Sequence, residues 1–330
     1  MSRFGACILD AECTSLTRDE KSLFKDVRPF GFILFARNIQ YPSQVRALCH
    51  EMREAAGHDA LIAIDQEGGR VQRLGEPYWR EWPPPLEFVA KAGRDAEEAM
   101  YMRYRIIASE LHDLGIYSNC APLVDVAWPS THAFLKNRCY GYTPDSVAKL
   151  GRAAASGLLG GGVLPVIKHI PGHGRSQADS HFELPRVDVA IEQLEKTDFI
   201  PFQYLNDMPL AMTAHIVYSR LGAEPATVSK SVVDVIRNKI GFDGLLMTDD
   251  ISMKALSGSA TETAKESLKA GCDVILHCNG SLAERTMVAN ASGEMSEMAQ
   301  KRAESALNMR GSPDDADIEE MEAKLQTLLS

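Results

Sequence analysis

The segment KHIPGHGRSQADSH, residues 168–181, concentrates histidine, lysine and aspartate side chains between small residues. His169 and His173 are four positions apart, a spacing that can bind zinc when it occurs on a helix. Pro171 and Gly172 lie between them and prevent the helix that such a site requires. We therefore expect no metal and no cofactor.

The end of this segment favours acid/base chemistry. Asp179, Ser180 and His181 are contiguous, so they cannot face one another as a Ser-His-Asp triad does. In an extended loop, residues two apart point the same way. Asp179 can then orient His181 and stabilise its charged form, which makes the imidazole a general acid/base. The alternative is a turn in which Asp179 only accepts hydrogen bonds from nearby backbone amides.

Two further segments carry carboxylates. LLMTDDISM contains Asp249 and Asp250, of which one can cap the following helix while the other faces an active site. An aspartate that faces an active site can attack a sugar carbon as a nucleophile. IDQEGGRVQRL places Asp65 close to Arg70 and Arg73. Asp65 can accept hydrogen bonds from vicinal hydroxyls of a ligand, or it can be a buried carboxylate paired with one of these arginines.

The elements that must position these residues alternate between two patterns. Eight short runs are apolar on both faces, as buried parallel strands are, and they cover residues 4–11, 30–36, 60–65, 117–127, 162–170, 210–218, 244–250 and 273–278. Helical segments separate them, such as 42–56 and 229–240. The alternation predicts an α/β fold, a single (β/α)8 TIM-type barrel. The alternative is an open doubly wound sheet, which would usually be divided into two domains at this length.

Polar residues recur at the ends of these runs. The third run ends at Asp65, the fifth at Lys168 and His169 and the seventh near Asp249, and His215 lies in the sixth. Barrel enzymes place their chemistry at the C-terminal ends of the strands. We therefore expect these side chains to converge on one site.

The composition indicates a soluble protein. A net charge of −10 argues against a nucleic-acid or anionic-membrane partner. The seven cysteines are scattered, as reduced thiols in the cytosol are. We also find no signal peptide and no apolar stretch of membrane length, so we expect a cytoplasmic protein. We expect a monomer with one domain over residues 1–330, including a C-terminal helical extension at about 281–330. Its last helix should turn Ile318, Met321 and Leu325 inward.

Together these motifs resemble the family 3 glycoside hydrolases, specifically the bacterial β-N-acetylglucosaminidases of peptidoglycan recycling. The matching segments are DQEGGRVQR (65–73), KNR (136–138), KHIPGHG (168–174), DSH (179–181), GFDGLLMTDDISM (241–253) and AGCDVIL (270–276). They occur in the family's order and span most of the chain. Ile170 stands where the family usually has phenylalanine, a change that leaves the polar groups in place.

The resemblance implies a role for each matching residue. Asp249 corresponds to the nucleophile that forms a covalent glycosyl-enzyme intermediate, His181 to the proton donor and acceptor, and Asp179 to the partner of His181. The residues that correspond to positions holding the N-acetylglucosamine ring are Asp65, Arg73, Arg138, Lys168 and His169, with supporting roles for His173 and Gly174.

The resemblance also implies a reaction and a substrate. A retaining exo-β-N-acetylglucosaminidase, a β-N-acetylhexosaminidase, would cleave terminal β-linked N-acetylglucosamine from GlcNAc-1,6-anhydro-MurNAc, with or without peptide. The alternatives are a β-N-acetylglucosaminide phosphorylase or a β-glucosidase on the same scaffold, and an inactive sugar-binding protein. The roles of Asp250 and Glu67 stay open.

Overall fold

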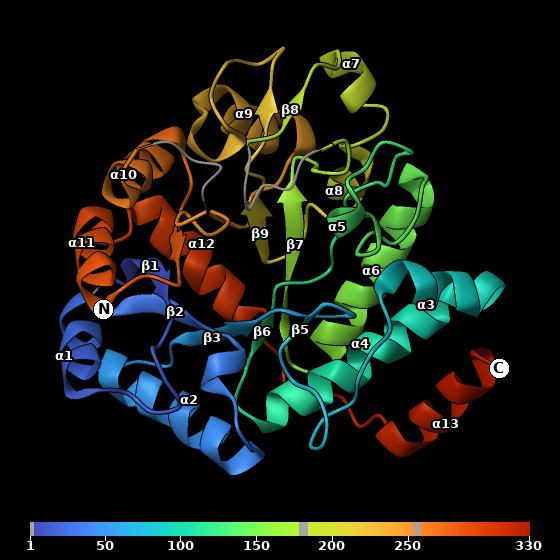
Figure 1. Cartoon of the computed structure of the whole chain (residues 1–330), viewed down its shortest axis with the longest axis horizontal. Coiled ribbons are helices and arrows are strands. Elements are labelled where there is room, and N and C mark those ends of the chain that lie inside the picture. Colours follow the sequence, from blue (N-terminus) through green and yellow to red (C-terminus); the bar gives the residue numbers. More distant parts are fainter. Residues whose placement is uncertain (1–2, 178–183, 254–257) are drawn as a thin grey trace.

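Parallel strands form the centre of the fold (Figure 1). The computed structural model describes residues 3–177, 184–253 and 258–330. In spatial order the eight strands of the main sheet are β11 (Leu245–Met247), β9 (Leu210–Thr213), β7 (Leu164–Ile170), β6 (Ser118–Asn119), β3 (Leu61–Ile64), β2 (Pro29–Leu34), β1 (Gly5–Leu9) and β12 (Ile275–His277). A parallel bridge between Met247 and Val274 joins the two ends of this order. The sheet therefore closes into a barrel, and each strand overlaps one of the eight predicted runs, which confirms the (β/α)8 fold.

Helices surround the barrel (Figure 1). They are α1 (Arg18–Val27), α2 (Pro42–Ala56), α3 (Pro85–Ala92), α4 (Ala96–Asp113), α5 (Ala133–Lys136), α6 (Pro144–Gly160), α7 (Ile191–Leu194), α8 (Ile200–Tyr204), α9 (Lys230–Val235), α10 (Ala260–Ala270), α11 (Leu282–Ser292), α12 (Glu297–Asn308) and α13 (Ile318–Leu328). Two small sheets lie in the connections, β4 (Gln66–Gly68) with β5 (Val71–Gln72), and β8 (Arg186–Val187) with β10 (Val217–Tyr218).

Local sequence signals set several helix ends. Thr17 and Glu20 form a reciprocal capping box at the start of α1, and the same arrangement begins α10 and α11. The predicted helix 42–56 is confirmed. The predicted helix 229–240 is α-helical only to Val235 and continues as a π-helix over Ile236–Ile240. Gly241 ends it in the left-handed conformation, with φ of 78°.

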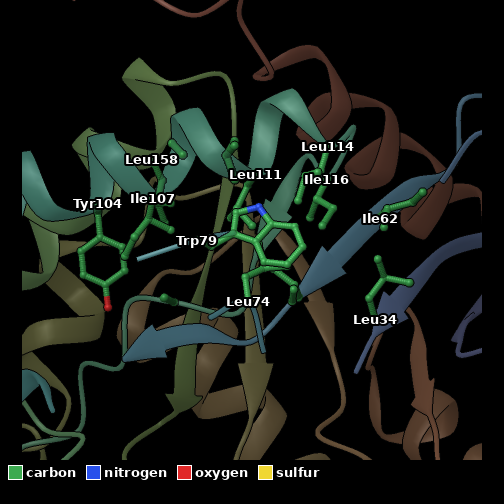
Figure 2. Close-up of a cluster of buried hydrophobic side chains, with 14 of the residues drawn as sticks. Leu34, Ile62, Leu74, Trp79, Tyr104, Ile107, Leu111, Leu114, Ile116 and Leu158 are labelled. Atoms are coloured by element: carbon green, nitrogen blue, oxygen red, sulfur yellow. The ribbon is translucent and has the colours of Figure 1, made fainter. Parts of the chain in front are cut away.

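The strands bury both faces, which explains their continuous apolar sequences. Alternate residues of most strands, such as Ala63, Val166 and Met212, fill the barrel interior. The outward residues pack against the helices, and Figure 2 shows one such cluster around Ile107 of α4 and Trp79. Because these layers are closely packed, the barrel can hold side chains at its C-terminal rim in fixed positions.

The last helix, α13, packs against α4. Leu325 is buried, and Ile318 and Met321 are partly buried against the same core, as the sequence pattern predicts. Ion pairs of Arg80 with Glu322 and of Lys324 with Glu98 connect α13 to neighbouring segments. Among the described helices, none is both long and apolar enough to cross a membrane.

Candidate active site

A cavity of about 350 Å³ opens at the C-terminal ends of the barrel strands. Ile33, Met212 and Leu276 of the barrel interior contribute apolar side chains to its lining. The predicted site residues that line it are Asp65, Arg73, Arg138, Lys168, His169, His173 and Asp249. The expected convergence of polar groups is therefore observed. Asp179 and His181 lie outside the described residues.

Two carboxylates and three cations form a connected group at this cavity. Asp65 accepts hydrogen bonds from Lys168 Nζ and from Arg73, each at 3.0 Å. Glu67 accepts two hydrogen bonds from Arg138, at 2.9 and 2.8 Å, and its Oε1 lies 2.5 Å from Lys168 Nζ. Lys168 therefore links Asp65, which lines the cavity, to Glu67, which is buried beside it. Asp65 is thus a carboxylate paired with Arg73, as one of the two alternatives predicts, and it also lines the cavity.

The hairpin of β4 and β5 positions these carboxylates. Gly68, at its turn, has φ of 112°, a conformation that glycine tolerates readily. A Cβ atom there would lie 1.9 Å from Nη2 of Arg103. Arg103 is fully buried and donates to the backbone carbonyls of Glu67 and Pro83. The Gly-Gly pair thus allows a guanidinium from α4 to hold the hairpin against the barrel.

The charges of this group stabilise one another. Burial alone would raise the pKa of Glu67, but Arg138 and Lys168 outweigh burial and lower it to about 2. Burial likewise opposes ionisation of Asp65, yet Lys168 and Arg73 hold the pKa of Asp65 well below its usual range. The two carboxylates raise the pKa of Lys168 above its ordinary value in spite of its burial. Asp65, Glu67 and Lys168 are therefore charged at neutral pH.

His169 and His173 share one buried partner, Asp125. Oδ2 of Asp125 lies 2.8 Å from Nδ1 of His169, and Oδ1 accepts the backbone N–H of His173 at 2.6 Å. Burial lowers the pKa of each histidine to about 3, so both rings are neutral at neutral pH. The ring nitrogens of His173 have no hydrogen-bond partner within the described part of the chain.

The two aspartates of the TDD motif have different surroundings. Asp249 lines the cavity, is partly exposed, and accepts the backbone N–H of Asp250 at 2.8 Å. Asp250 accepts the backbone N–H groups of Ser252 and Cys278, at 3.0 and 3.2 Å. The alternative in which one of the pair caps the following helix is wrong, because α10 begins at Ala260 and is capped by Ser259. Asp250 instead connects the loop after β11 to the loop after β12.

His215 does not contribute to the cavity lining formed by the described residues. It lies just beyond β9 rather than within a strand. Its Nδ1 is 2.7 Å from Oγ1 of Thr227, and its Nε2 is 2.9 Å from the carbonyl oxygen of Asp250. The predicted place of His215 in the site is therefore wrong, because both ring nitrogens are used to support the loop that carries the aspartates.

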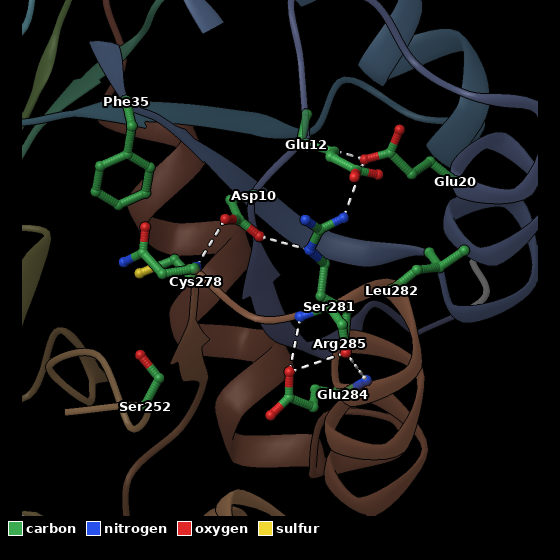
Figure 3. A network of polar contacts seen from close by, with 12 residues as sticks. Asp10, Glu12, Glu20, Phe35, Ser252, Cys278, Ser281, Leu282, Glu284 and Arg285 are labelled. Carbon is green, nitrogen blue, oxygen red and sulfur yellow. Dashed lines mark hydrogen bonds and ion pairs between the residues drawn. The ribbon is translucent and has the colours of Figure 1, made fainter. Parts of the chain in front are cut away.

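A polar network also supports the rim of the cavity at Asn279. Asp10 accepts the backbone N–H of Asn279 at 2.8 Å. It also pairs with Arg285 at 2.8 Å (Figure 3). Arg285 also contacts Glu20 at 3.0 Å. Arg37 pairs with Asp10 and donates to Oδ1 of Asn279 at 2.9 Å. Segments from both ends of the chain thus fix this part of the rim.

Sequence reasoning missed the importance of Asp125 and left Glu67 undecided. The signal for Asp125 was its position near the end of the fourth apolar run, where a charge is unexpected in a buried strand. Asn279, with φ of 64°, gave no recognisable signal. Within residues 3–177, 184–253 and 258–330, no group of three or more acidic, histidine or cysteine side chains is placed to hold a metal ion.

Comparisons with known proteins agree with this geometry. The family model described as "Glycosyl hydrolase family 3 N terminal domain" matches residues 8–308. A β-hexosaminidase from Alkalilimnicola ehrlichii is 36% identical over 283 residues, covering 83% of this chain and 81% of the relative. One from Nitrosospira multiformis is 34% identical over 322 residues, covering 94% of this chain and 89% of the relative.

Solved structures give the same result. NagZ from Neisseria gonorrhoeae, in complex with N-trifluoroacetyl-D-glucosamine, has a TM-score of 0.87 and 30% identity, with 99% of each chain covered. A family 3 β-N-acetylglucosaminidase from Paenibacillus sp. also has a TM-score of 0.87 and 30% identity, covering 98% of this chain and 67% of that protein. The chain therefore belongs to glycosyl hydrolase family 3 and is a glycoside hydrolase.

Proposed function

We propose that this chain is a retaining exo-β-N-acetylglucosaminidase. It removes terminal N-acetylglucosamine from GlcNAc-1,6-anhydro-MurNAc, with or without peptide, during cytoplasmic recycling of peptidoglycan. The observation that carries the proposal is the shared cavity of Asp249 and the group around Lys168. The β-hexosaminidases and β-N-acetylglucosaminidases among its relatives support the choice of an N-acetylated sugar.

The cavity provides matched groups for one sugar ring. Asp65 is an ionised acceptor for hydroxyl protons, and Lys168, Arg73 and Arg138 are donors. Charged partners make such hydrogen bonds short and directional. A volume of about 350 Å³ suits a single N-acetylated pyranose rather than a longer glycan, which supports exo action.

The proposed reaction has two displacements. The Asp249 carboxylate attacks the anomeric carbon, the glycosidic bond breaks, and His181 gives its proton to the leaving oxygen. His181 then takes a proton from water, whose oxygen attacks the anomeric carbon and releases Asp249. Asp179 orients the imidazole throughout. Two inversions at one carbon leave the β configuration of the product unchanged.

The test compares an aryl N-acetyl-β-glucosaminide with the matching aryl β-glucoside, in buffer with EDTA and with or without phosphate. We expect turnover of the N-acetyl substrate alone, no effect of phosphate, and the β-anomer as the first product by NMR. Asp249→Asn should reduce kcat by at least about 1,000-fold.

Each alternative has its own outcome in this test. Formation of N-acetylglucosamine 1-phosphate would identify a phosphorylase, and preference for the glucoside would identify a β-glucosidase. The α-anomer as first product would overturn the retaining mechanism. Binding without turnover, on the aryl substrates and on the anhydro-muropeptide alike, would leave a sugar-binding protein.

A further inference from the structure

Asp125 occupies an unusual position for a carboxylate. It follows β6, is fully buried, and does not belong to the described lining of the cavity. Its oxygens face three nitrogens: Nδ1 of His169 at 2.8 Å, the backbone N–H of His173 at 2.6 Å and the backbone N–H of His169 at 3.3 Å. The two backbone groups can only donate, so they fix the orientation of the carboxylate beside the His169 ring.

The arrangement selects one form of the His169 ring. Neutral imidazole carries its proton on one nitrogen and a lone pair on the other. The oxygen beside Nδ1 favours the proton there, since a carboxylate can only accept. Nε2 is then left with the lone pair, and the ring lines the cavity. Histidines whose second nitrogen is fixed by a carboxylate behave in the same way in metal sites, where the partner sets tautomer and orientation.

We propose that Asp125 is a positioning residue that presents Nε2 of His169 to the substrate as a hydrogen-bond acceptor. Lys168, the preceding residue, can only donate. The pair therefore offers one acceptor and one donor, a combination that selects hydroxyl groups, because a hydroxyl can do both. This inference rests on the proposed function for the identity of the ligand, a sugar ring, but not for the state of the histidine.

The isosteric variant Asp125→Asn makes a specific prediction. The backbone N–H of His173 cannot reverse its direction, so the single amide oxygen of asparagine should remain there. The amide NH₂ group then faces Nδ1 of His169, and the ring must move its proton to Nε2. The cavity would thereby lose an acceptor and gain a donor. We expect kcat/KM to fall by about 10- to 100-fold, as is usual when a buried polar group is left without its partner.

Two measurements separate this role from a merely structural one. Long-range ¹H–¹⁵N spectra of histidine-labelled protein report which nitrogen of His169 is protonated, with His169→Ala used for assignment. The wild type should show Nδ1 protonated, and Asp125→Asn should show Nε2 protonated. In a double-mutant cycle, Asp125→Asn should cost far less activity in the His169→Ala background than in the wild type.

Asp273→Asn is the matched control. Asp273 is also buried, accepts a backbone N–H from Leu246 at 2.9 Å and pairs with Arg237 and Arg302, outside the described cavity lining. The Asp273→Asn variant should have a lower free energy of unfolding, but the same His169 tautomer and the same kcat/KM as the wild type. A His169 ring protonated at Nε2 in the wild type would overturn the proposal, even if Asp125→Asn does not fold. Equal losses of activity from Asp125→Asn in the wild-type and His169→Ala backgrounds would also overturn it. An inactive wild type with Nδ1 protonated would instead count against the proposed function alone.

Discussion

Glu67→Gln changes one charge at the centre of the buried group. The substitution keeps the shape of the side chain but removes the partner of Arg138 and one of the two carboxylates at Lys168. Glu67 and Lys168 are almost completely buried, so water cannot replace the lost interaction. We expect the variant to lose both stability and activity.

The magnitude follows from the pKa of Glu67. Its lowering from 4.5 to about 2 corresponds to roughly 3 kcal/mol in favour of the ionised form. Breaking a buried ion pair by removing one partner costs about 3–5 kcal/mol, which agrees. Because the folded-state pKa is the lower one, this stabilisation is complete above about pH 4.5 and is lost as the pH falls through about 2. The deficit of the variant should therefore be constant between pH 8 and pH 5.

Activity should fall because Lys168 and Arg138 move when they lose a partner. A displacement of about 1 Å in a substrate-positioning group can reduce the rate about 100-fold. The assay is kcat/KM on the aryl N-acetyl-β-glucosaminide, together with the free energy of unfolding in urea. Asp273→Asn is the control, because Asp273 is also buried and paired with arginines, but lies outside the described cavity lining. The reasoning is refuted if Glu67→Gln is as stable as the wild type or loses no more activity than Asp273→Asn.

Three further predictions concern glycine, histidine and arginine positions. Gly174→Ala should prevent folding or lower Tm strongly, because the new Cβ would lie 1.8 Å from the backbone oxygen of Val126. Gly311→Ala is the control and should leave Tm unchanged, because no atom of the described chain lies within 4 Å of its Cβ; similar Tm values for the two variants would contradict the prediction. His169 and His173 are neutral in the folded protein but gain protons in the unfolded chain as the pH falls. The free energy of unfolding should therefore fall below about pH 6.5, by about 1.4 kcal/mol per pH unit for each histidine. Urea unfolding at pH 7 and pH 5.5 checks this, and equal free energies of unfolding at the two pH values would refute it. Arg103→Lys removes the planar guanidinium that lies over the rings of Trp82 and Phe88 while its Nη2 donates to the carbonyls of Glu67 and Pro83. We therefore expect lower kcat/KM through a looser hairpin, with unchanged kinetics as the contrary result.

Local sequence determined most of the architecture. The eight apolar runs, the helix at 42–56 and the final helix all carry patterns that depend only on neighbouring residues. Strand order and closure followed from the alternation of elements, since a βα repeat of this length forms few folds. The positions of Asp65, Lys168 and Asp249 at strand ends also indicated one site, because parallel strands bring their C-terminal ends together.

Only the tertiary structure decided which polar groups meet. Glu67 and Arg138 are 71 positions apart, and Asp125 and His169 are 44 apart. No local pattern distinguishes such partners from ordinary surface charges, because pairing depends on how the closed barrel places separate loops beside one another. His215 illustrates the same limit: its position near a strand end indicated the site, but packing turned its ring toward Thr227. Periodicity is a property of adjacent residues, whereas the charge partners of an active site are a property of the closed fold.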